Sequence, residues 1–396
     1  MPKDMSTFRA TVVGLAALAI AMGIGRFAFT PLLPMMRDDG LVTIGGGGLL
    51  ASVHFLGYLL GALSAAWLPG SPKTLMRVSL LTIGAATVGM GLSDQFALWT
   101  ALRFLAGLCS AWTLVLISNF CIKHLAQAGR TDLHGWVFSG VGVGIALAGL
   151  GCVAMMAAGI GSAAGWQIFG VMSLIAVAVL WLLIGPEFAG STPTQRQASS
   201  KRSPLVWSIV AAYGAIGLGY VIPATYLPVM AREFVQSPLV FGWSWPIFGA
   251  AAFVSTLFAA RLYRRFTNRQ IWIGSQVVMA AGLLMPVLFA NIVSIVLAGL
   301  CVGGTFMIIT MAGMKEAHAI APPEDVVRHI AALTAAFAAG QMIGPLFAGV
   351  LYELTRSFAL SLISTSFVLL VTAWMLWRHR APAPAPQEEA RQPVRS

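Results

Sequence analysis

The chain has 396 residues, of which 58% are hydrophobic and only 9% are Asp, Glu, Lys or Arg. Soluble domains are about 25% charged, so this composition lacks the residues that cover a water-facing surface. The mean hydropathy of +0.84 indicates a polytopic membrane protein and excludes a soluble enzyme, a disordered chain and a DNA-binding domain.

The first apolar stretch, from about residue 10 to residue 36, follows the basic residues Lys3 and Arg9. A positive flank before an apolar run is also typical of a signal peptide. This run is too long for the apolar core of a signal peptide, however, and no small-x-small cleavage site follows it. We therefore expect a retained first helix.

Apolar segments of membrane-spanning length follow one another along the chain, since a helix needs about 20 mostly apolar residues to cross the hydrocarbon core. The predicted spans are about 10–36, 43–68, 75–93, 96–125, 131–158, 164–185, 206–231, 240–262, 271–290, 292–317, 328–352 and 357–377. The longest polar break between them is 186–204. We predict an all-α membrane protein with twelve transmembrane helices in two six-helix repeats.

The domain boundaries follow from that break. The prediction is an N-terminal six-helix bundle at 1–185, a cytoplasmic linker at 186–204, a C-terminal six-helix bundle at 205–377 and a disordered cytoplasmic tail at 378–396. The tail carries an Ala-Pro repeat, which is typical of extended, unpacked chain.

The basic residues predict the orientation, because Lys and Arg gather on the cytoplasmic side of membrane proteins. If the N-terminus is cytoplasmic, most of the 24 Lys and Arg lie on that side. The opposite side receives Arg37, Arg232 and Arg356. We expect a bacterial-type inner (plasma) membrane protein with both termini in the cytoplasm. The net charge of +11 is then a topology signal, and no nucleic-acid partner is expected.

The two predicted halves repeat each other. Gly23-Ile-Gly25 matches Gly217-Leu-Gly219, and Leu33-Pro34-x-Met36 matches Leu227-Pro228-x-Met230, both at an offset of 194 residues. Gly140-x-x-x-Gly144 recurs as Gly340-x-x-x-Gly344. Any one match could arise by chance between Gly-rich helices, but several matches in the same order indicate a duplication.

A duplication of six plus six helices with both ends inside resembles the major facilitator superfamily. The stretch from Gly23 to Pro34 is similar to the first-helix signature of its YbfB/YjiJ-like branch, Arg103-x-x-x-Gly107 to the fourth-helix Arg motif, and Gly344-Pro345 to a Gly/Pro-rich motif. The resemblance implies a secondary transporter that works by alternating access, with a midplane site between the halves. The loop at 68–73 lacks the superfamily's usual Asp-Arg and basic pair.

Few ionisable residues are expected deep in the membrane. All 13 Asp and Glu fall in loops, tails or helix ends, whereas Arg26, His54 and Arg103 lie within spans. An Arg at a helix centre costs at least about 2.5–3.5 kcal/mol, so it needs a partner or a water-filled cavity. Our hypothesis is that Arg26 binds an anionic group of the substrate. The alternative is a structural Arg bonded to carbonyls that Pro31 and Pro34 leave free.

Each of the other candidate ligands also has a structural alternative. Arg103 is expected either to contact the substrate or to pack against a neighbouring helix. His54, with Tyr58 one turn away, either carries a proton or is neutral and hydrogen-bonded. Tyr220, which replaces Arg26 in the seventh span, and Gln341 are ligands or helix–helix hydrogen-bond partners. The predicted substrate-binding residues are Arg26, His54, Tyr58, Arg103, Tyr220 and Gln341.

Small and helix-breaking residues are predicted to serve helix packing and gating. These are Gly23, Gly25, Pro31, Pro34, Gly140, Gly144, Gly340, Gly344 and Pro345. The four cysteines form no CxxC pair, and no His lies at metal-ligand spacing. Because Walker, Gly-x-Ser-x-Gly and His-Glu-x-x-His motifs are also missing, no catalytic residue, metal or cofactor is expected and the chain is not expected to be an enzyme.

The sequence therefore predicts a secondary active transporter for a small organic anion or amphipathic metabolite. Its expected partners are that solute, the lipid bilayer and, if His54 titrates, protons. One alternative is a multidrug-type exporter, because 12 Trp, 22 Phe and 18 Met can line an adaptable apolar pocket. Another is a membrane-embedded sensor without transport, for which no output domain is recognisable.

Overall fold

The computed structural model describes residues 6–65, 71–184, 204–322 and 325–378, and in these ranges its regular secondary structure is helical. The first half holds α1 (Thr7–Leu18), the π-helix η1 (Ala19–Ile24), α2 (Phe29–Asp38), α3 (Ile44–Ser64), α4 (Pro72–Met90), α5 (Phe96–Gln127), the 3-10 helix η2 (Thr131–Leu133), α6 (His134–Ala157) and α7 (Ser162–Leu183). The second half holds α8 (Trp207–Phe234), α9 (Pro238–Phe241), α10 (Ser244–Leu262), α11 (Asn268–Leu288), α12 (Ile292–Ile320), α13 (Val326–Thr355) and α14 (Ala359–Arg378).

The prediction of an all-α protein with twelve long helices is confirmed. Eleven segments of the described chain are long and apolar enough to cross a membrane, counting Thr7–Asp38 and Pro238–Ala259 as single spans. The helix α4 is the twelfth and packs between α5 and α7. The predicted linker at 186–204 lies outside the described residues except for Pro204, as does the predicted tail beyond Arg378.

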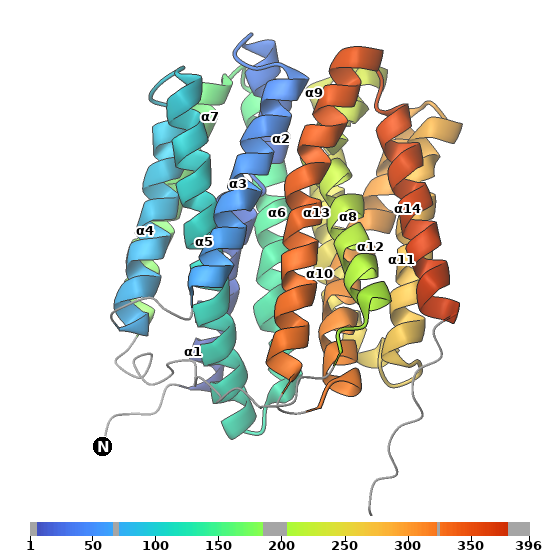
Figure 1. Cartoon of the computed structure of the whole chain (residues 1–396). Coiled ribbons are helices and arrows are strands. Elements are labelled where there is room, and N and C mark those ends of the chain that lie inside the picture. The colour runs from blue at the N-terminus through green and yellow to red at the C-terminus, as the bar shows by residue number, and fades with distance from the viewer. Residues whose placement is uncertain (1–5, 66–70, 185–203, 323–324, 379–396) are drawn as a thin grey trace, which may run out of the picture.

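Contacts between helices repeat at equivalent positions of the two halves (Figure 1). Within the first half α3 packs on α5 and α1 on α6, and within the second half α10 packs on α12 and α8 on α13. Between the halves α3 packs on α13, α6 on α10 and α2 on α8. Since α3 corresponds to α10 and α13 to α6 in the repeat, the first two interfaces are copies of one another.

Glycines allow the closest of these approaches. A side chain at Gly140 would lie 2.2 Å from the carbonyl oxygen of Leu15, and one at Gly340 would lie 2.3 Å from that of Gly214. Small residues let backbones pack this closely in membranes, where the lipid supplies no hydrophobic driving force between helices. The structure thus places the predicted Gly repeats at the α1–α6 contact and its repeat copy, α8–α13.

The first span is interrupted near its middle. The N–H groups of Gly25 and Phe27 bond the carbonyls of Ile20 (2.8 Å) and Met22 (3.1 Å), five residues back, which is the widened pattern of η1. Pro31 has no N–H to give to the carbonyl of Phe27. The N–H of Thr30 bonds that carbonyl instead, at 3.2 Å. A turn at residues 25–28 therefore separates η1 from α2.

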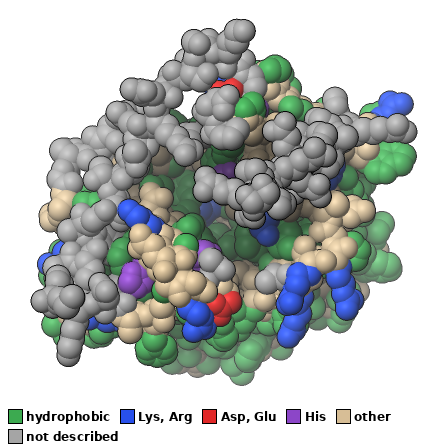
Figure 2. All heavy atoms as spheres, turned by 90° about the horizontal axis from the view of Figure 1, so that it is seen from below, with side chains coloured by type: hydrophobic (Ala, Val, Ile, Leu, Met, Phe, Trp, Pro, Cys, Tyr) green, Lys and Arg blue, Asp and Glu red, His purple; other side chains and the backbone are tan. Residues whose placement is uncertain are grey.

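The two ends of the bundle differ. We call the end that holds α9 and the last turn of α2 the upper end, and the end where α1 begins the lower end, as they stand in Figure 1. Figure 2 shows the lower face hollowed near its middle, with hydrophobic side chains within the hollow. The upper end is bridged by polar contacts between the halves.

Candidate functional site

Arg26 lies at the centre of the bundle, in the turn between η1 and α2, and is only 4% exposed. Its Nη2 donates a hydrogen bond to the hydroxyl of Tyr220 on α8. The side-chain amide of Gln341 on α13 donates to the same oxygen. Three candidates that the sequence placed in different spans thus meet at one phenol oxygen. One of them comes from the first half and two from the second.

Aromatic rings surround this meeting point. The guanidinium carbon of Arg26 lies 4.8, 4.7 and 4.9 Å from the ring centroids of Phe27, Phe55 and Tyr58. Such contacts stabilise a cation and cover its faces, while the N–H edge stays open to acceptors. The Nε of Arg26 and the Oε1 of Gln341 are buried without a hydrogen-bond partner.

On the second-half side, the ring of Tyr220 is stacked between those of Phe306 and Phe337, at centroid distances of 5.1 and 5.5 Å. Tyr220 is itself only 1% exposed. Because both faces of the phenol are covered, its hydroxyl is held at a fixed point opposite Arg26.

No carboxylate among the described residues forms an ion pair with the central guanidinium groups. The described residues form ion pairs at Arg130–Asp132, Arg232–Asp38, Arg269–Glu316 and Arg356–Glu353, and Arg26 and Arg103 take part in none of these. This agrees with the distribution of acidic residues in the sequence. Donors therefore converge on the centre of the protein without a matching negative charge.

Arg103 on α5 is 3% exposed and points at the backbone of the first span. Its Nη1 and Nη2 donate to the carbonyl oxygens of Gly25 (3.2 Å) and Arg26 (3.4 Å). Its guanidinium also lies 4.7 Å from the ring centroid of Phe29. Of the two roles that the sequence allowed, the observed contacts are those of a helix-contacting residue. It is thus Arg103, and not Arg26, that bonds the carbonyls of the interrupted helix.

His54 on α3 is fully buried, and both of its ring nitrogens lack a hydrogen-bond partner. Its ring stands edge-on to Phe55 at 5.7 Å. The helix α5 packs closely against the backbone of His54, since a side chain at Gly107 would lie 2.0 Å from the His54 carbonyl oxygen. Tyr58 lies beside Arg26, and no hydrogen bond between Tyr58 and His54 is present among the described residues.

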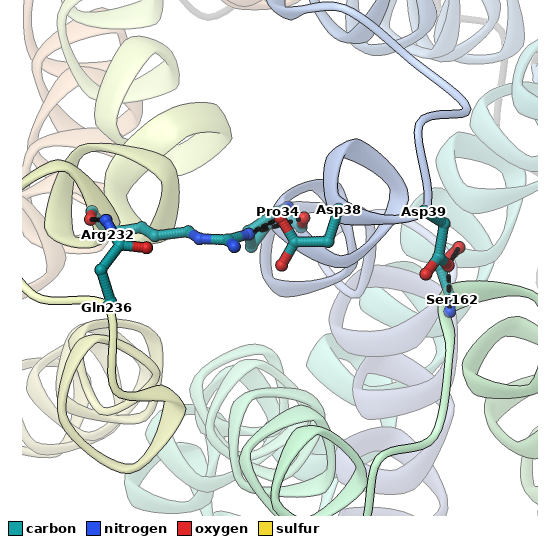
Figure 3. Close-up of polar contacts among 6 residues, drawn as sticks. All are labelled: Pro34, Asp38, Asp39, Ser162, Arg232 and Gln236. Carbon is teal, nitrogen blue, oxygen red and sulfur yellow. Dashed lines mark hydrogen bonds and ion pairs between the residues drawn. The ribbon is translucent and has the colours of Figure 1, made fainter.

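Sequence reasoning missed a second polar contact between the same two spans (Figure 3). Arg232 on α8 forms an ion pair with Asp38 at the end of α2, and its Nη1 donates to the Pro34 carbonyl at 3.3 Å. Asp39 turns the other way and accepts bonds from the backbone N–H (2.7 Å) and hydroxyl (2.5 Å) of Ser162, within the first half. Asp38 and Arg232 are 194 residues apart, so the repeat offset was the available signal.

Further contacts close the upper end between α3 and α13. The carboxylate of Glu353 accepts from the N–H of Gly45 at 3.0 Å. The hydroxyl of Tyr226 donates to the carbonyls of Pro345 (2.8 Å) and Ile44 (3.3 Å). The structure thus places Pro345, predicted as a gating or packing residue, at this closed end.

The hydroxyl of Thr30 donates to the carbonyl of Ala224 across the α2–α8 contact. Like Arg26 and Tyr220, these residues are separated by 194 positions. Residues related by the repeat therefore touch each other at three levels of the first and seventh spans. This is the geometry expected when two equivalent helices lie side by side along a pseudo-twofold axis.

The described ranges contain no cluster of metal-binding side chains. No group of three or more His, Cys, Asp or Glu side chains is placed to hold an ion there. Cys109, Cys121, Cys152 and Cys301 are free thiols. The side chains that line the candidate site carry guanidinium, phenol, amide and imidazole groups.

Twelve long helices of the described chain, arranged as two consecutive repeats with a donor-rich centre between them, define a multi-pass membrane transporter of the major facilitator type. The chain belongs to the family described as "Uncharacterised MFS-type transporter YbfB", whose pattern matches residues 18–377. It is a transporter and not an enzyme, and its substrate is a small molecule.

Known proteins similar to this chain support that assignment. An "Uncharacterized MFS-type transporter YceJ" from Bacillus subtilis (strain 168) is 25% identical over 364 residues, which cover 86% of this chain and 89% of that protein. Among solved structures, the nucleoside transporter NupG matches with a TM-score of 0.71 at 14% identity, covering 93% of this chain and 98% of the other. An inward-facing, unoccupied bacterial homologue of the human lysosomal transporter Spinster matches with a TM-score of 0.67 at 16% identity, covering 94% and 97%. At these identities the structural matches show the fold alone.

Proposed function

We propose that this protein is a secondary transporter for a small organic anion, which binds at Arg26 between the two halves. The observation that carries the proposal is the convergence of two side-chain donors, from Arg26 and Gln341, on the single hydroxyl of Tyr220. No carboxylate of the described residues pairs with Arg26. Ionisable groups within membrane spans are costly and usually functional.

The phenol oxygen marks the position of a ligand oxygen in this proposal. A carboxylate that displaces it accepts from Arg26 and Gln341 and receives the Tyr220 hydroxyl as a third donor. Hydrogen bonds with a charged partner are about twice as strong as neutral ones, so the exchange favours an anion over a neutral acceptor. The rings around Arg26 suit a solute with an apolar body, such as an amphipathic metabolite.

Alternating access completes the proposal. The N-terminal bundle (1–185) and the C-terminal bundle (205–377) rock about the central site, joined by the linker at 186–204. The upper end is closed in this structure, and the lower face is hollowed (Figure 2). With the lower end and both termini in the cytoplasm of a bacterial-type inner membrane, the site faces inward here.

Proton coupling is part of the proposal through His54, which is fully buried with unpartnered nitrogens. Histidine is the side chain whose ordinary titration range spans physiological pH. Burial disfavours the charged imidazole, so in this proposal the proton binds His54 when the site opens to water. A proton carried there together with a monoanion at Arg26 would make each transport cycle electroneutral. A pH gradient would then drive accumulation of the solute, and a membrane potential alone would not.

The charge preference can be tested with a matched pair of ring compounds, benzoate and its neutral amide benzamide. A ligand that binds only the folded state raises its thermal stability. We expect benzoate to stabilise the purified full-length protein and benzamide to stabilise it less. Arg26→Gln should abolish this preference. The control Arg77→Gln should retain it, because Arg77 bonds the carbonyl of Trp181 away from the centre.

Transport itself is tested by counterflow of labelled benzoate in proteoliposomes. Uptake that requires unlabelled benzoate inside, and that Arg26→Gln abolishes, supports the anion site. Equal stabilisation by benzoate and benzamide in the wild type, or an unchanged preference in a folded Arg26→Gln variant, would refute it.

The aromatic contacts favour one second candidate, a multidrug-type exporter of hydrophobic compounds. Rings follow one another within 6.0 Å from Phe27 through Trp245 and Phe248 to Phe306 and Tyr220. Such a surface binds flat apolar molecules regardless of charge. In that case benzamide should match benzoate, and Arg26→Gln should leave both unaffected. Family membership as a transporter argues against the third alternative, a sensor without transport.

A further inference from the structure

One face of α5 holds the interrupted part of the first span. Arg103 bonds the carbonyls of Gly25 and Arg26, and Ser110, two turns further on, bonds the carbonyl of Ala21 at 2.8 Å. We propose that Arg103 is the positioning residue of the anion site: it fixes the backbone that carries Arg26 and does not itself contact the transported solute. The inference rests on the proposed function for the identity of the ligand.

The need for such a residue follows from the backbone bonding. In an uninterrupted α-helix the carbonyl of Arg26 would accept from the N–H of Thr30. The N–H of Thr30 bonds the carbonyl of Phe27 instead, because Pro31 has no N–H to donate to that carbonyl. A buried carbonyl without a donor costs about 1–3 kcal/mol, and in a membrane interior no bulk water is present to satisfy it. Arg103 supplies the missing donors from a neighbouring helix.

The guanidinium shape matters as much as its charge. Arg presents a planar fork of donors, so two of its nitrogens bond two successive carbonyls at once, here at 3.2 and 3.4 Å. Lysine keeps the charge but carries it on a single flexible nitrogen. Arg103→Lys therefore removes the two-point contact and retains the positive potential.

The same contacts argue against Arg103 as a ligand. Nη1 and Nη2 are engaged by backbone carbonyls, and the ring of Phe29 lies 4.7 Å from the guanidinium carbon. The donors that point at the Tyr220 hydroxyl belong to Arg26 and Gln341. Arg103 thus contacts the backbone that carries Arg26, the residue that we propose binds the solute.

The first test needs no ligand. Hydrogen exchange measured by mass spectrometry on the full-length protein reports local opening. We expect Arg103→Lys to speed exchange in peptides from residues 19–31 by about tenfold relative to wild type. Arg77→Lys is the matched control, since Arg77 also bonds a carbonyl of the first half, that of Trp181. It should leave residues 19–31 unchanged.

The second test separates positioning from direct binding. We expect Arg103→Lys to bind benzoate about tenfold more weakly, because small displacements of a binding group are costly, yet to keep the preference over benzamide. Arg26→Gln should lose that preference.

Several outcomes overturn the inference. Unchanged exchange in residues 19–31 shows that Arg103 does not hold this segment. Faster exchange with unchanged benzoate affinity leaves Arg103 a structural residue only. Loss of the carboxylate preference in Arg103→Lys, as in Arg26→Gln, makes it a ligand. If the wild type shows no preference, the proposed function fails, and the positioning role falls with it even if the exchange result holds.

If Arg103→Lys does not fold, Pro31→Ala tests the same idea with Arg103 intact. It restores an N–H for the Phe27 carbonyl and frees that of Thr30 to bond Arg26, in competition with Arg103. We expect a folded protein with weakened benzoate binding. Unchanged binding would contradict the inference, because the interruption would then be irrelevant to the position of Arg26.

Discussion

Three pairs of repeat-related residues join the first and seventh spans, and the two pairs that meet through both side chains differ in kind. At the centre, Arg26 meets the neutral phenol of Tyr220, and the two residues are 4% and 1% exposed. At the upper end, Asp38 meets Arg232, with side chains 41% and 27% exposed. No carboxylate of the described chain pairs with the central cation, whereas the outer pair neutralises itself.

This difference indicates separate functions for the central contact and the contact at the upper end. An uncompensated buried cation attracts an anion, since solvent does not screen it as it screens surface charges. An exposed ion pair contributes only about 0–1 kcal/mol, so it can form and break within a transport cycle. The same pair of helices thus holds a strong site for a solute and a weak, reversible contact between the halves.

The largest expected effect tests how closely the helix backbones pack near the contact between Arg26 and Tyr220. A side chain at Gly23 would lie 2.3 Å from the backbone of Gly144, and one at Gly217, its repeat partner, 2.2 Å from the carbonyl oxygen of Phe337. Backbone cannot move aside cheaply, so we expect Gly23→Ala and Gly217→Ala each to lower the free energy of unfolding by about 3 kcal/mol. Thermal denaturation in detergent measures this.

The control for both variants is Gly274→Ala on α11, where an added side chain meets nothing within 4 Å. Helix propensity favours Ala there by about 1 kcal/mol, so stability should be equal or higher. If Gly23→Ala is as stable as Gly274→Ala, the helices are not tightly packed around Arg26 and Tyr220. The difference between this buried contact and the exposed ion pair at the upper end would then not be supported.

A smaller effect is expected from Tyr220→Phe, which removes the oxygen shared by Arg26 and Gln341. Two buried donors then lack their acceptor, which should cost the unliganded protein about 2 kcal/mol. If a carboxylate takes the place of the phenol oxygen, benzoate should restore part of this loss. The thermal shift caused by benzoate should therefore be larger in Tyr220→Phe than in wild type. A smaller shift would show that the phenol is itself the main ligand group.

Much of this arrangement could be predicted from the sequence. Length and hydropathy mark eleven of the spans in the described chain, all but α4, because lipid demands long apolar helices. The repeat aligns Arg26 with Tyr220, and the structure brings both to Gln341. Both signals, the hydropathy of a span and the offset of the repeat, extend over a whole helix and can therefore be read from the sequence.

Other features could not be predicted because they depend on exact backbone geometry. Pro31 is visible in the sequence, but the bonds from Arg103 to Gly25 and Arg26 depend on how the turn at residues 25–28 faces α5, which periodicity does not reveal. Asp38 and Asp39 are adjacent acids at a helix end and look alike in sequence. One nevertheless joins the halves and the other stays within the first half (Figure 3), a difference that only the direction of each side chain decides.

The smallest expected effect tests the upper end through these two acids. Asp38→Asn removes the ion pair with Arg232, while Asp39→Asn weakens only the contact with Ser162. A cysteine in place of the buried Val229, in a background without the native cysteines, reports opening between the centre and the upper end. We expect Asp38→Asn to raise its labelling rate about two- to threefold, equivalent to about 0.5 kcal/mol, and Asp39→Asn to leave it unchanged.

Salt should separate an electrostatic contact from simple packing. Raising ionic strength screens an exposed pair, so labelling of the Val229→Cys reporter should quicken with salt in the wild-type background and not in Asp38→Asn. The exchanged pair Asp38→Arg with Arg232→Asp should restore slow labelling, because the charges again face each other. Equal rates for the Asp38 and Asp39 variants would mean that the ion pair does not hold the halves together. The contacts of Glu353 and Tyr226 between α3 and α13 would then remain as the closure of the upper end.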